Sequence, residues 1–326
     1  YEKLSSKRAV SQKDSMDTIF CVENGELVNA REDNEFFNTV QKKTANLLST
    51  ATLCALFYEK ILGDVKKEQM NDFSAGLVVL LTFGKKLHVY LDQEDDHRSF
   101  LLYRSLQYAD DWGNDTSDMD NLIEYVTKMD RDSLAIISVP GNIITKAAYE
   151  RFEGVVHKLC EFLQIFKPDL QEIEIEKKED RDIYVCNLNM VYDTYKIHAE
   201  YESTGIKKLI RLFAYLREMV RGGIVFIDEF DSNLHDVYLC ALLEYLMEYG
   251  EGQLCFTTHN VGPMDILKRN KKSIDFLSID HKIYPWTTNG NYSPSRLYRN
   301  GMIEGSPFNV DSIDFIGVFG PEEEEN

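Results

Sequence analysis

Ile-Val-Phe-Ile-Asp-Glu, at residues 224–229, is the stretch of sequence that decides the fold. Its first four residues are apolar and favour β-structure, so they predict a short buried strand. Its last two residues, Asp228 and Glu229, then lie at the carboxyl end of that strand. Open α/β sheets bind their ligands at this edge, so the stretch predicts a ligand site that contains two carboxylates.

Helices and strands alternate on both sides of this strand. Apolar residues at helical spacing occupy residues 205–220 before it and residues 236–249 after it. Further strands are predicted at residues 253–257 and 273–279. This alternation is typical of a parallel α/β architecture, in which each helix crosses over between two strands of one sheet.

The beginning of the chain predicts a small β-ribbon that leads into helices. Short strands at residues 18–22 and 26–28 are joined at Asn24-Gly25, a favourable pair for a hairpin turn. Apolar residues at helical spacing follow in residues 45–62. We therefore expect a two-stranded hairpin ahead of a helical region.

More helices and a β-meander are predicted before residue 205. Helical spacing recurs around residues 73–89, and a long amphipathic helix is predicted for residues 145–166, where Lys167-Pro168 ends it. Three stretches with period-two alternation follow, and they predict an antiparallel meander. These stretches are residues 172–176, 183–190 and 194–201.

The composition excludes some classes of protein. With 36 basic and 55 acidic residues the net charge is −19, so the surface as a whole repels a nucleic-acid backbone. Nucleic-acid contact would need a local basic patch, and the candidates are Lys207, Lys208 and Arg211 or the basic run at residues 268–272. No apolar run reaches the roughly 18 residues of a membrane helix. Six cysteines without close pairs indicate a reducing compartment, so we expect a cytoplasmic protein without a membrane span.

The two carboxylates after the strand suit nucleotide hydrolysis. Phosphoryl transfer requires that negative charge be neutralised and that the attacking water be held in line. We therefore assign Asp228 to Mg²⁺ and Glu229 to the water. Taken alone this motif is weak, because apolar strands that end in acidic residues are common at surface turns.

Two further polar clusters strengthen the assignment through their order along the chain. Ser203 and Gly205 stand where a strand turns into a helix, and there a hydroxyl group and backbone N–H groups can bind a phosphate. His259 follows the next strand, where it can hydrogen-bond a γ-phosphate or the catalytic water. The ordinary alternatives are an N-cap at Ser203 and a polar loop residue at His259.

As a set, these residues resemble the head of an ABC-class ATPase. In that comparison residues 203–205 correspond to the signature motif, residues 224–229 to the Walker B strand, residues 231–235 to the D-loop and His259 to the switch histidine. Residues 228–235 read Asp-Glu-Phe-Asp-Ser-Asn-Leu-His. They are most similar to the stand-alone AAA-type family that includes the OLD (overcoming lysogenization defect) and other bacterial defence ATPases, relatives of RecF and of the SMC heads.

The resemblance is clear over residues 201–279 and implies a P-loop NTPase fold of the ABC type. It also implies ATP and Mg²⁺ as cofactors, a role for Asp231 in nucleotide binding, and a homodimer that holds ATP between two heads. Two positions depart from the family pattern. Ile206 stands where a small or hydroxyl residue is common, and Asp236 stands where proline usually follows the Leu-His pair.

No P-loop motif occurs in the sequence. The nearest approach, Gly84-Lys85-Lys86, lacks both the first glycine and the hydroxyl residue. In the resembling family the P-loop precedes a β-ribbon, so we expect this segment to lie before Tyr1 in the intact protein. The implied domains are a β-ribbon remnant at residues 1–31, a helical insertion lobe at 32–166, the ATPase core at 167–320 and an acidic tail at 321–326.

The function that the resemblance implies is ATP hydrolysis as a dimeric switch in anti-phage defence or DNA maintenance, with a nuclease or toxin as a possible effector partner. Two alternatives stay open. Asp228, Glu229 and Asp231 could be the ligands of a Mg²⁺-dependent nuclease, since clustered carboxylates can hold two metal ions. The chain could also be an interaction module that does not hydrolyse ATP.

Overall fold

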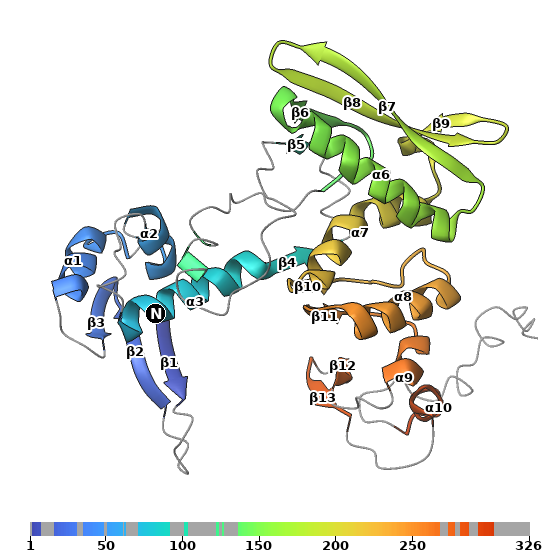
Figure 1. Ribbon diagram of the computed structural model, residues 1–326. Coiled ribbons are helices and arrows are strands. Elements are labelled where there is room, and N and C mark those ends of the chain that lie inside the picture. The colour runs from blue at the N-terminus through green and yellow to red at the C-terminus, as the bar shows by residue number, and fades with distance from the viewer. Residues whose placement is uncertain are drawn as a thin grey trace, which may run out of the picture. The chain divides into compact units, whose positions relative to one another are not determined.

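The computed structural model describes residues 2–7, 16–30, 35–48, 51–60, 62, 71–91, 101–103, 122–123, 126, 136–267, 273–277, 281–286 and 293–302. The chain divides into two compact units. The first consists of Tyr1–Phe226 with Glu251–Cys255, and the second of Ile227–Gly250 with Phe256–Asn326. Both contain helices and strands, so the chain has a mixed α/β fold (Figure 1).

An antiparallel sheet begins the first unit. β1 (Glu2–Lys7), β2 (Met16–Glu23) and β3 (Glu26–Ala30) lie in that order across the sheet. Asn24 and Gly25 connect β2 to β3 with φ angles of 52° and 80°, and a type I′ hairpin turn requires such positive values. The predicted hairpin is therefore confirmed. β1 was not predicted, because it has a single apolar residue and so shows no alternation.

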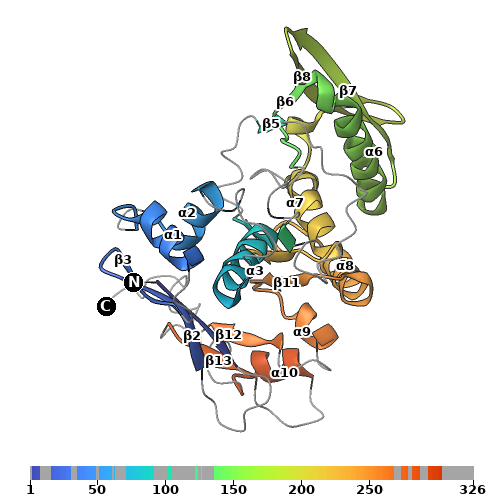
Figure 2. The ribbon, with the colours of Figure 1, turned by 60° about the vertical axis from the view of Figure 1, so that its left-hand side comes forward.

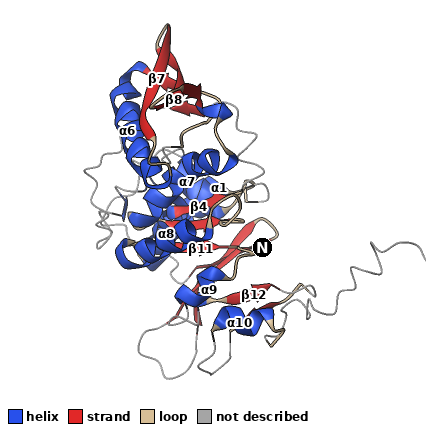
Figure 3. Cartoon of the chain, turned by 90° about the vertical axis from the view of Figure 1, so that its right-hand side faces the viewer, coloured by secondary structure: helices blue, strands red, loops and turns tan. Residues whose placement is uncertain are grey.

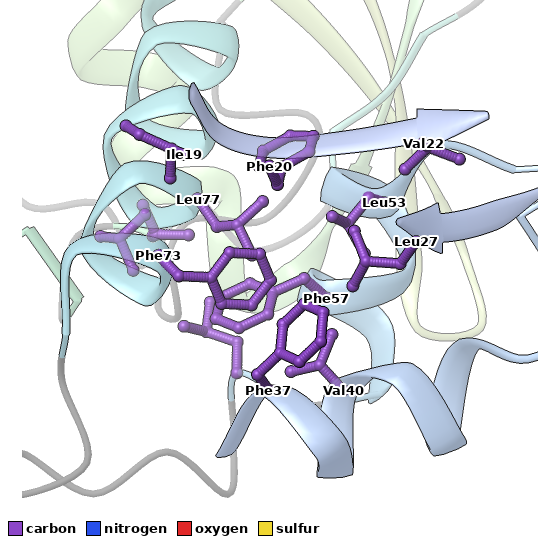
Figure 4. Packing of buried hydrophobic residues seen from close by; sticks show 13 residues of the cluster. Ile19, Phe20, Val22, Leu27, Phe37, Val40, Leu53, Phe57, Phe73 and Leu77 are labelled. Atoms are coloured by element: carbon purple, nitrogen blue, oxygen red, sulfur yellow. The ribbon is translucent and has the colours of Figure 1, made fainter. Parts of the chain in front are cut away.

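The main core of the first unit joins this sheet to three helices. These are α1 (Glu35–Thr44), α2 (Leu53–Lys60) and α3 (Asp72–Lys86). The Phe73 ring meets Phe20 of β2 edge-on at 6.1 Å between centroids and Phe37 of α1 at 5.7 Å (Figure 4). Each such buried ring contributes about 1.5–3 kcal/mol of stability. Phe73 therefore connects strand and helix in one packed cluster.

α3 is shorter than the helical pattern of the sequence predicts. It ends at Lys86, and the strand β4 (Leu87–Tyr90) follows at once. β4 is a neighbour of β10 (Ile224–Ile227) in a three-stranded sheet. Tyr90 is fully buried, and its ring lies 5.3 Å from that of Tyr215. These contacts with distant parts of the chain outweigh the local helical spacing, so the helix prediction is wrong at its carboxyl end.

A second sheet of the first unit has a long helix packed against it. Its strand order is β5-β6-β8-β7, and β9 also pairs with β8. β8 is antiparallel to β6, β7 and β9, whereas β5 and β6 are parallel. The strands are β5 (Leu101–Tyr103), β6 (Asn142–Thr145), β7 (Leu170–Asp180), β8 (Ile183–Tyr192) and β9 (Lys196–His198).

Helix α6 (Tyr149–Phe166) lies along this sheet (Figure 3). Alternate residues of β8 are buried, as expected for a strand with one covered face. The helix ends one residue before Lys167, as Lys167-Pro168 predicts. Its start lies later than predicted, because Asn142–Thr145 is a strand and Lys146–Ala148 a short 3₁₀ helix.

The strand β10 lies between two neighbours in the sheet order β11-β10-β4. It follows helix α7 (Thr204–Val220), and helix α8 (Asp236–Tyr249) connects it to β11 (Gln253–Phe256). The Gln253 amide donates to the Gly223 carbonyl at 2.9 Å and the Thr257 amide to the Ile227 carbonyl at 3.0 Å. In these two hydrogen-bonded pairs the residue numbers rise together on both strands, so β10 and β11 run parallel, as the alternating pattern predicts.

The end of the second unit differs from the predicted parallel arrangement. β12 (Asp275–Leu277) pairs antiparallel with β13 (Ile283–Pro285) in a separate sheet. Helices α9 (Gly262–Ile266) and α10 (Pro294–Arg299) lie beside this ribbon (Figure 2). Trp286 is buried in the small core that these elements share. Among the described helices, none combines the length and apolar character needed to cross a membrane.

Two glycine substitutions should affect stability in opposite directions. Gly252→Ala should lower the free energy of unfolding by about 1–3 kcal/mol. An added Cβ there would lie 2.1 Å from the Gly223 carbonyl oxygen and 2.4 Å from that of Met219. Gly154→Ala, in α6 with nothing within 4 Å of the added atom, should raise it by about 0.5–1 kcal/mol. Urea unfolding measures both, and a Gly252→Ala variant that is as stable as the natural protein or more stable would contradict the close approach at Gly252.

Candidate functional site

The chain leaves β10 through an unusual turn. Glu229 has a φ angle of 48°, in the left-handed region that costs most residues about 1–2 kcal/mol. Its carbonyl accepts from the Ser232 amide at 3.0 Å. Asn233 also has a positive φ, of 59°, which asparagine tolerates better than glutamate does. Backbone strain at a glutamate is a feature of functional sites, so it marks Glu229 for closer attention.

Thr257 connects the two acidic residues. Its hydroxyl group donates to Oδ1 of Asp228 at 2.6 Å and accepts from the backbone N–H of Glu229 at 2.8 Å. Its carbonyl accepts from the Phe230 amide at 3.0 Å. The side chains of Asp228 and Glu229 are both exposed. The residue after β11 therefore fixes the carboxyl end of β10 and leaves two carboxylates at the surface.

Phe230 anchors this turn from below. It is fully buried, and its ring meets that of Phe256 at 5.4 Å in an edge-on arrangement. The left-handed backbone of Glu229 thus lets its carboxylate point outward while the ring of the next residue, Phe230, is buried. This packing offsets the cost of the strained backbone, so the turn has one preferred conformation.

Asp231 carries an oxygen atom without a partner. Its Oδ1 is buried and makes no hydrogen bond within the described part of the chain. Leaving a buried acceptor unsatisfied costs about 1–3 kcal/mol. Such a group needs an explanation, and a donor that arrives with a ligand or a second protomer is one.

The loop after β11 is tied to the start of α8. The Asn260 side chain donates to Asp236 and accepts from the Gly262 amide at 2.8 Å. Asp236, the departure from the family pattern, therefore has a structural partner at the first helical position. His259 lies between Thr258 and Asn260 in this loop and is exposed. In the sequence, His259 follows Thr257, the residue that contacts Asp228, by two positions.

Ser203 is the N-cap of α7. Its Oγ accepts from the Ile206 amide at 3.3 Å, and its own side chain is exposed. Ile206 is buried, so its departure from the family pattern serves packing on the inner side of α7. Gly205 stands in the same first turn. Ser203 and Gly205 belong to the first unit, whereas the other predicted site residues, Asp228, Glu229, Asp231 and His259, belong to the second.

The acidic residues suit one kind of metal site better than another. Among the described residues, no three His, Cys, Asp or Glu side chains converge as metal ligands. Mg²⁺ in nucleotide sites usually binds one or two carboxylates together with phosphates and water, so the exposed carboxylate of Asp228 fits that ion. A nuclease site built from Asp228, Glu229 and Asp231 would need such a converging set, and the geometry gives it no support.

Neither predicted basic patch is seen as a surface patch among the described residues. Lys208 is 1% exposed, so the trio of Lys207, Lys208 and Arg211 does not form a surface patch. The basic run at residues 268–272 lies outside the described residues. Gly84 and Lys85 belong to α3, where the Lys85 ammonium donates to the Val126 carbonyl at 2.7 Å. That segment is therefore not a phosphate-binding loop.

One protein family matches the chain. Its description is "AAA domain, putative AbiEii toxin, Type IV TA system", and the match covers residues 93–265, more than half of the chain. The chain belongs to this AAA family. The matched residues include all six predicted site residues, whose roles remain predictions. AAA domains of this kind are nucleotide-binding ATPases. No curated protein matches the chain.

Sequence reasoning missed Thr257 and Glu202. Thr257 stands directly after an apolar strand, which is the one local signal for its role. Its partner Asp228 lies 29 positions away in the sequence, so the contact depends on the pairing of β10 with β11. Glu202 is buried and accepts a hydrogen bond from Tyr192 of β8. The sequence shows it only as an acidic residue ahead of an N-cap.

Removal of the Thr257 hydroxyl should loosen the turn after β10. Thr257→Val keeps the shape of the side chain but leaves the Asp228 carboxylate and the Glu229 amide without this partner, so we expect a loss of about 1 kcal/mol of stability. Thr257→Ser keeps the hydroxyl and should lie within about 0.5 kcal/mol of the natural protein. Chemical unfolding compares the two, and a Thr257→Val variant as stable as the natural protein would show that the hydroxyl does not stabilise the turn.

Strain at Glu229 predicts a gain in stability on substitution. Glu229→Gly should raise the free energy of unfolding by up to about 1 kcal/mol, because glycine adopts a positive φ without penalty. Asn233→Gly, at a similar φ, should give a smaller gain because asparagine already tolerates this conformation. Thermal unfolding of both variants provides the test. A loss of stability in Glu229→Gly would mean that the left-handed turn carries no strain.

Proposed function

We propose that this AAA protein binds and hydrolyses ATP as a dimeric switch of the ABC type. The observation that carries the proposal is the end of β10. There the Thr257 hydroxyl bonds to the Asp228 carboxylate and to the Glu229 backbone N–H, and both acidic side chains are exposed. Nucleotide hydrolysis needs one carboxylate for a cation and one for water, and this arrangement offers both.

The roles follow from the chemistry of each side chain. Asp228 would hold Mg²⁺, which when bound would neutralise negative charge on the phosphates. Glu229 would orient the attacking water and accept its proton. His259, exposed in the loop after β11, would hydrogen-bond the terminal phosphate or the water. The Thr257 hydroxyl donates to the Asp228 carboxylate and so restricts its orientation.

The dimer is the second element of the proposal. In ABC-type heads the signature of one protomer closes on the nucleotide of the other, so Ser203 and Gly205 would act on the partner's ATP. An interface of this kind is two-fold symmetric, and each protomer contributes half of each site. The orphaned Oδ1 of Asp231 supports this view, because a donor from the nucleotide or the partner would satisfy it.

The biological setting is a proposal at the level of the family. The matching family's description names an AbiEii toxin of a type IV toxin–antitoxin system. This supports anti-phage defence as the setting, with the OLD-like and RecF–SMC-like ATPases as the group to which the D-loop sequence is most similar. The partner would be an effector that responds to ATP-dependent closure of the dimer.

Glu229→Gln tests the proposal in the full-length natural gene product that contains this sequence. The amide can hold water but cannot accept its proton, so we expect kcat to fall at least about 100-fold. ATP should remain bound, and the dimer should accumulate in size-exclusion chromatography with ATP and Mg²⁺.

Glu248→Gln is the matched control, because Glu248 is an exposed carboxylate on α8 outside the site. It should leave turnover and dimerisation unchanged. If the natural protein shows no ATP turnover, and Glu229→Gln neither traps nucleotide nor stabilises a dimer, the proposal fails. An interaction module that does not hydrolyse ATP would then be the better description.

A further inference from the structure

Glu202, the residue before the proposed signature serine, is a buried carboxylate. Its side chain is 8% exposed. One oxygen accepts a hydrogen bond from the Tyr192 hydroxyl, and the other accepts from the backbone N–H of Ser203 at 3.1 Å. Burying a carboxylate is costly unless hydrogen bonds satisfy it, and both oxygens of Glu202 are satisfied. The residue therefore links Tyr192 to Ser203.

Tyr192 is a rigid anchor for this link. It is the last residue of β8 and is 4% exposed. Its ring stacks on that of Tyr195 at 4.6 Å, and the Lys167 ammonium lies 5.0 Å from its centre. Burial, and next the hydrogen bond to Glu202, raise the pKa of Tyr192 above its ordinary value. The hydroxyl therefore remains a proton donor at neutral pH.

Ser203 is held at three points. Its N–H donates to Glu202, its carbonyl accepts from the Lys207 amide at 3.0 Å, and its Oγ accepts from the Ile206 amide at 3.3 Å. The last two bonds are what any serine N-cap provides. The bond to Glu202 is additional, since starting a helix does not require it. It fixes the peptide group that precedes the serine and so fixes the direction in which the side chain leaves the backbone.

We propose that Glu202 is a positioning residue that sets the orientation of Ser203, and that Tyr192 holds Glu202 in place. The orientation of the signature serine then depends on the end of β8, a strand of the second sheet of the first unit. This inference rests on the proposed function, in which Ser203 contacts the nucleotide of the partner. It adds a connection between that contact and the sheet that contains β8.

The test uses Tyr192→Phe and Glu202→Gln in the full-length protein that carries Glu229→Gln. Tyr192→Phe removes one hydroxyl and keeps the ring, and Glu202→Gln keeps an acceptor but loses the charge. Two quantities are measured: the exchange rate of the Ser203 amide hydrogen, and the ATP concentration that gives half-maximal dimerisation. ATP binding by the monomer is followed separately with a fluorescent ATP analogue.

We expect the Ser203 amide to exchange about tenfold faster in both variants, because its charged acceptor is misplaced or lost. The ATP concentration for half-maximal dimerisation should rise about tenfold, while ATP binding by the monomer stays unchanged. Tyr201→Phe and Glu200→Gln are the matched controls. Tyr201 and Glu200 are exposed neighbours whose side chains do not bond to Ser203, so these variants should change neither quantity.

Ser203→Asp separates this inference from the proposed function. Aspartate keeps the N-cap but repels a phosphate, so this variant should abolish ATP-dependent dimerisation. If Ser203→Asp has no effect, the proposed role of Ser203 is wrong. If Ser203→Asp abolishes dimerisation but Tyr192→Phe and Glu202→Gln leave both the amide exchange and the dimer unchanged, the positioning role of Glu202 is overturned and the proposed function stands.

Discussion

The hydrogen bonds of the Thr257 hydroxyl are the constraint on which the proposed site depends. The residues that follow the carboxyl end of a parallel strand are usually exposed to solvent and can adopt many conformations. Here the hydroxyl accepts from the Glu229 amide and donates to the Asp228 carboxylate, so the first two residues beyond β10 are fixed by the residue beyond β11. The pairing of β10 with β11 therefore also sets the positions of the two acidic residues.

The residues of the site break local rules that the cores obey. Glu229 adopts a left-handed backbone, one oxygen of Asp231 is buried without a partner, and Glu202 is a buried carboxylate. Each costs free energy in the isolated chain. The cluster around Phe73, by contrast, is made of apolar side chains in ordinary packing. A protein tolerates such local costs where function requires them and offsets them by packing elsewhere.

The sequence predicts the centre of the fold well because that part follows local rules. β10, α7, α8 and β11 each have a clear period and clear ends, and their order predicts a parallel pair. β4 was missed, and the strand at β12 was expected to belong to the parallel arrangement. The conformation of β4 is decided by Tyr90 and its sheet neighbour, and that of β12 by pairing with β13. The local spacing of apolar residues does not reveal such contacts between distant parts of the chain.

The same distinction applies to the site. Asp228 and Glu229 could be found from the strand that precedes them, because the carboxyl end of a strand is where ligands bind in such sheets. Thr257 and Glu202 could not, because their roles consist of contacts with residues of other elements. The buried state of Lys208 was equally hidden, since a lysine beside another lysine in a sequence looks like surface.

Charge explains why such a site would work only when assembled. Three of the six predicted site residues, Asp228, Glu229 and Asp231, carry negative charge toward a ligand that is itself an anion, and none of the six is a lysine or an arginine. Triphosphate would therefore bind weakly to these carboxylates alone, and positive charge has to come from Mg²⁺ and from basic groups outside this set. The N-terminus of α7 offers N–H dipoles rather than a full charge, so it adds attraction without creating a strong site by itself. The nucleotide then binds tightly mainly when Mg²⁺, the basic groups and the N-terminus of α7 all surround it. Under the proposed function, that is the physical reason for ATP to favour the closed dimer over separate protomers.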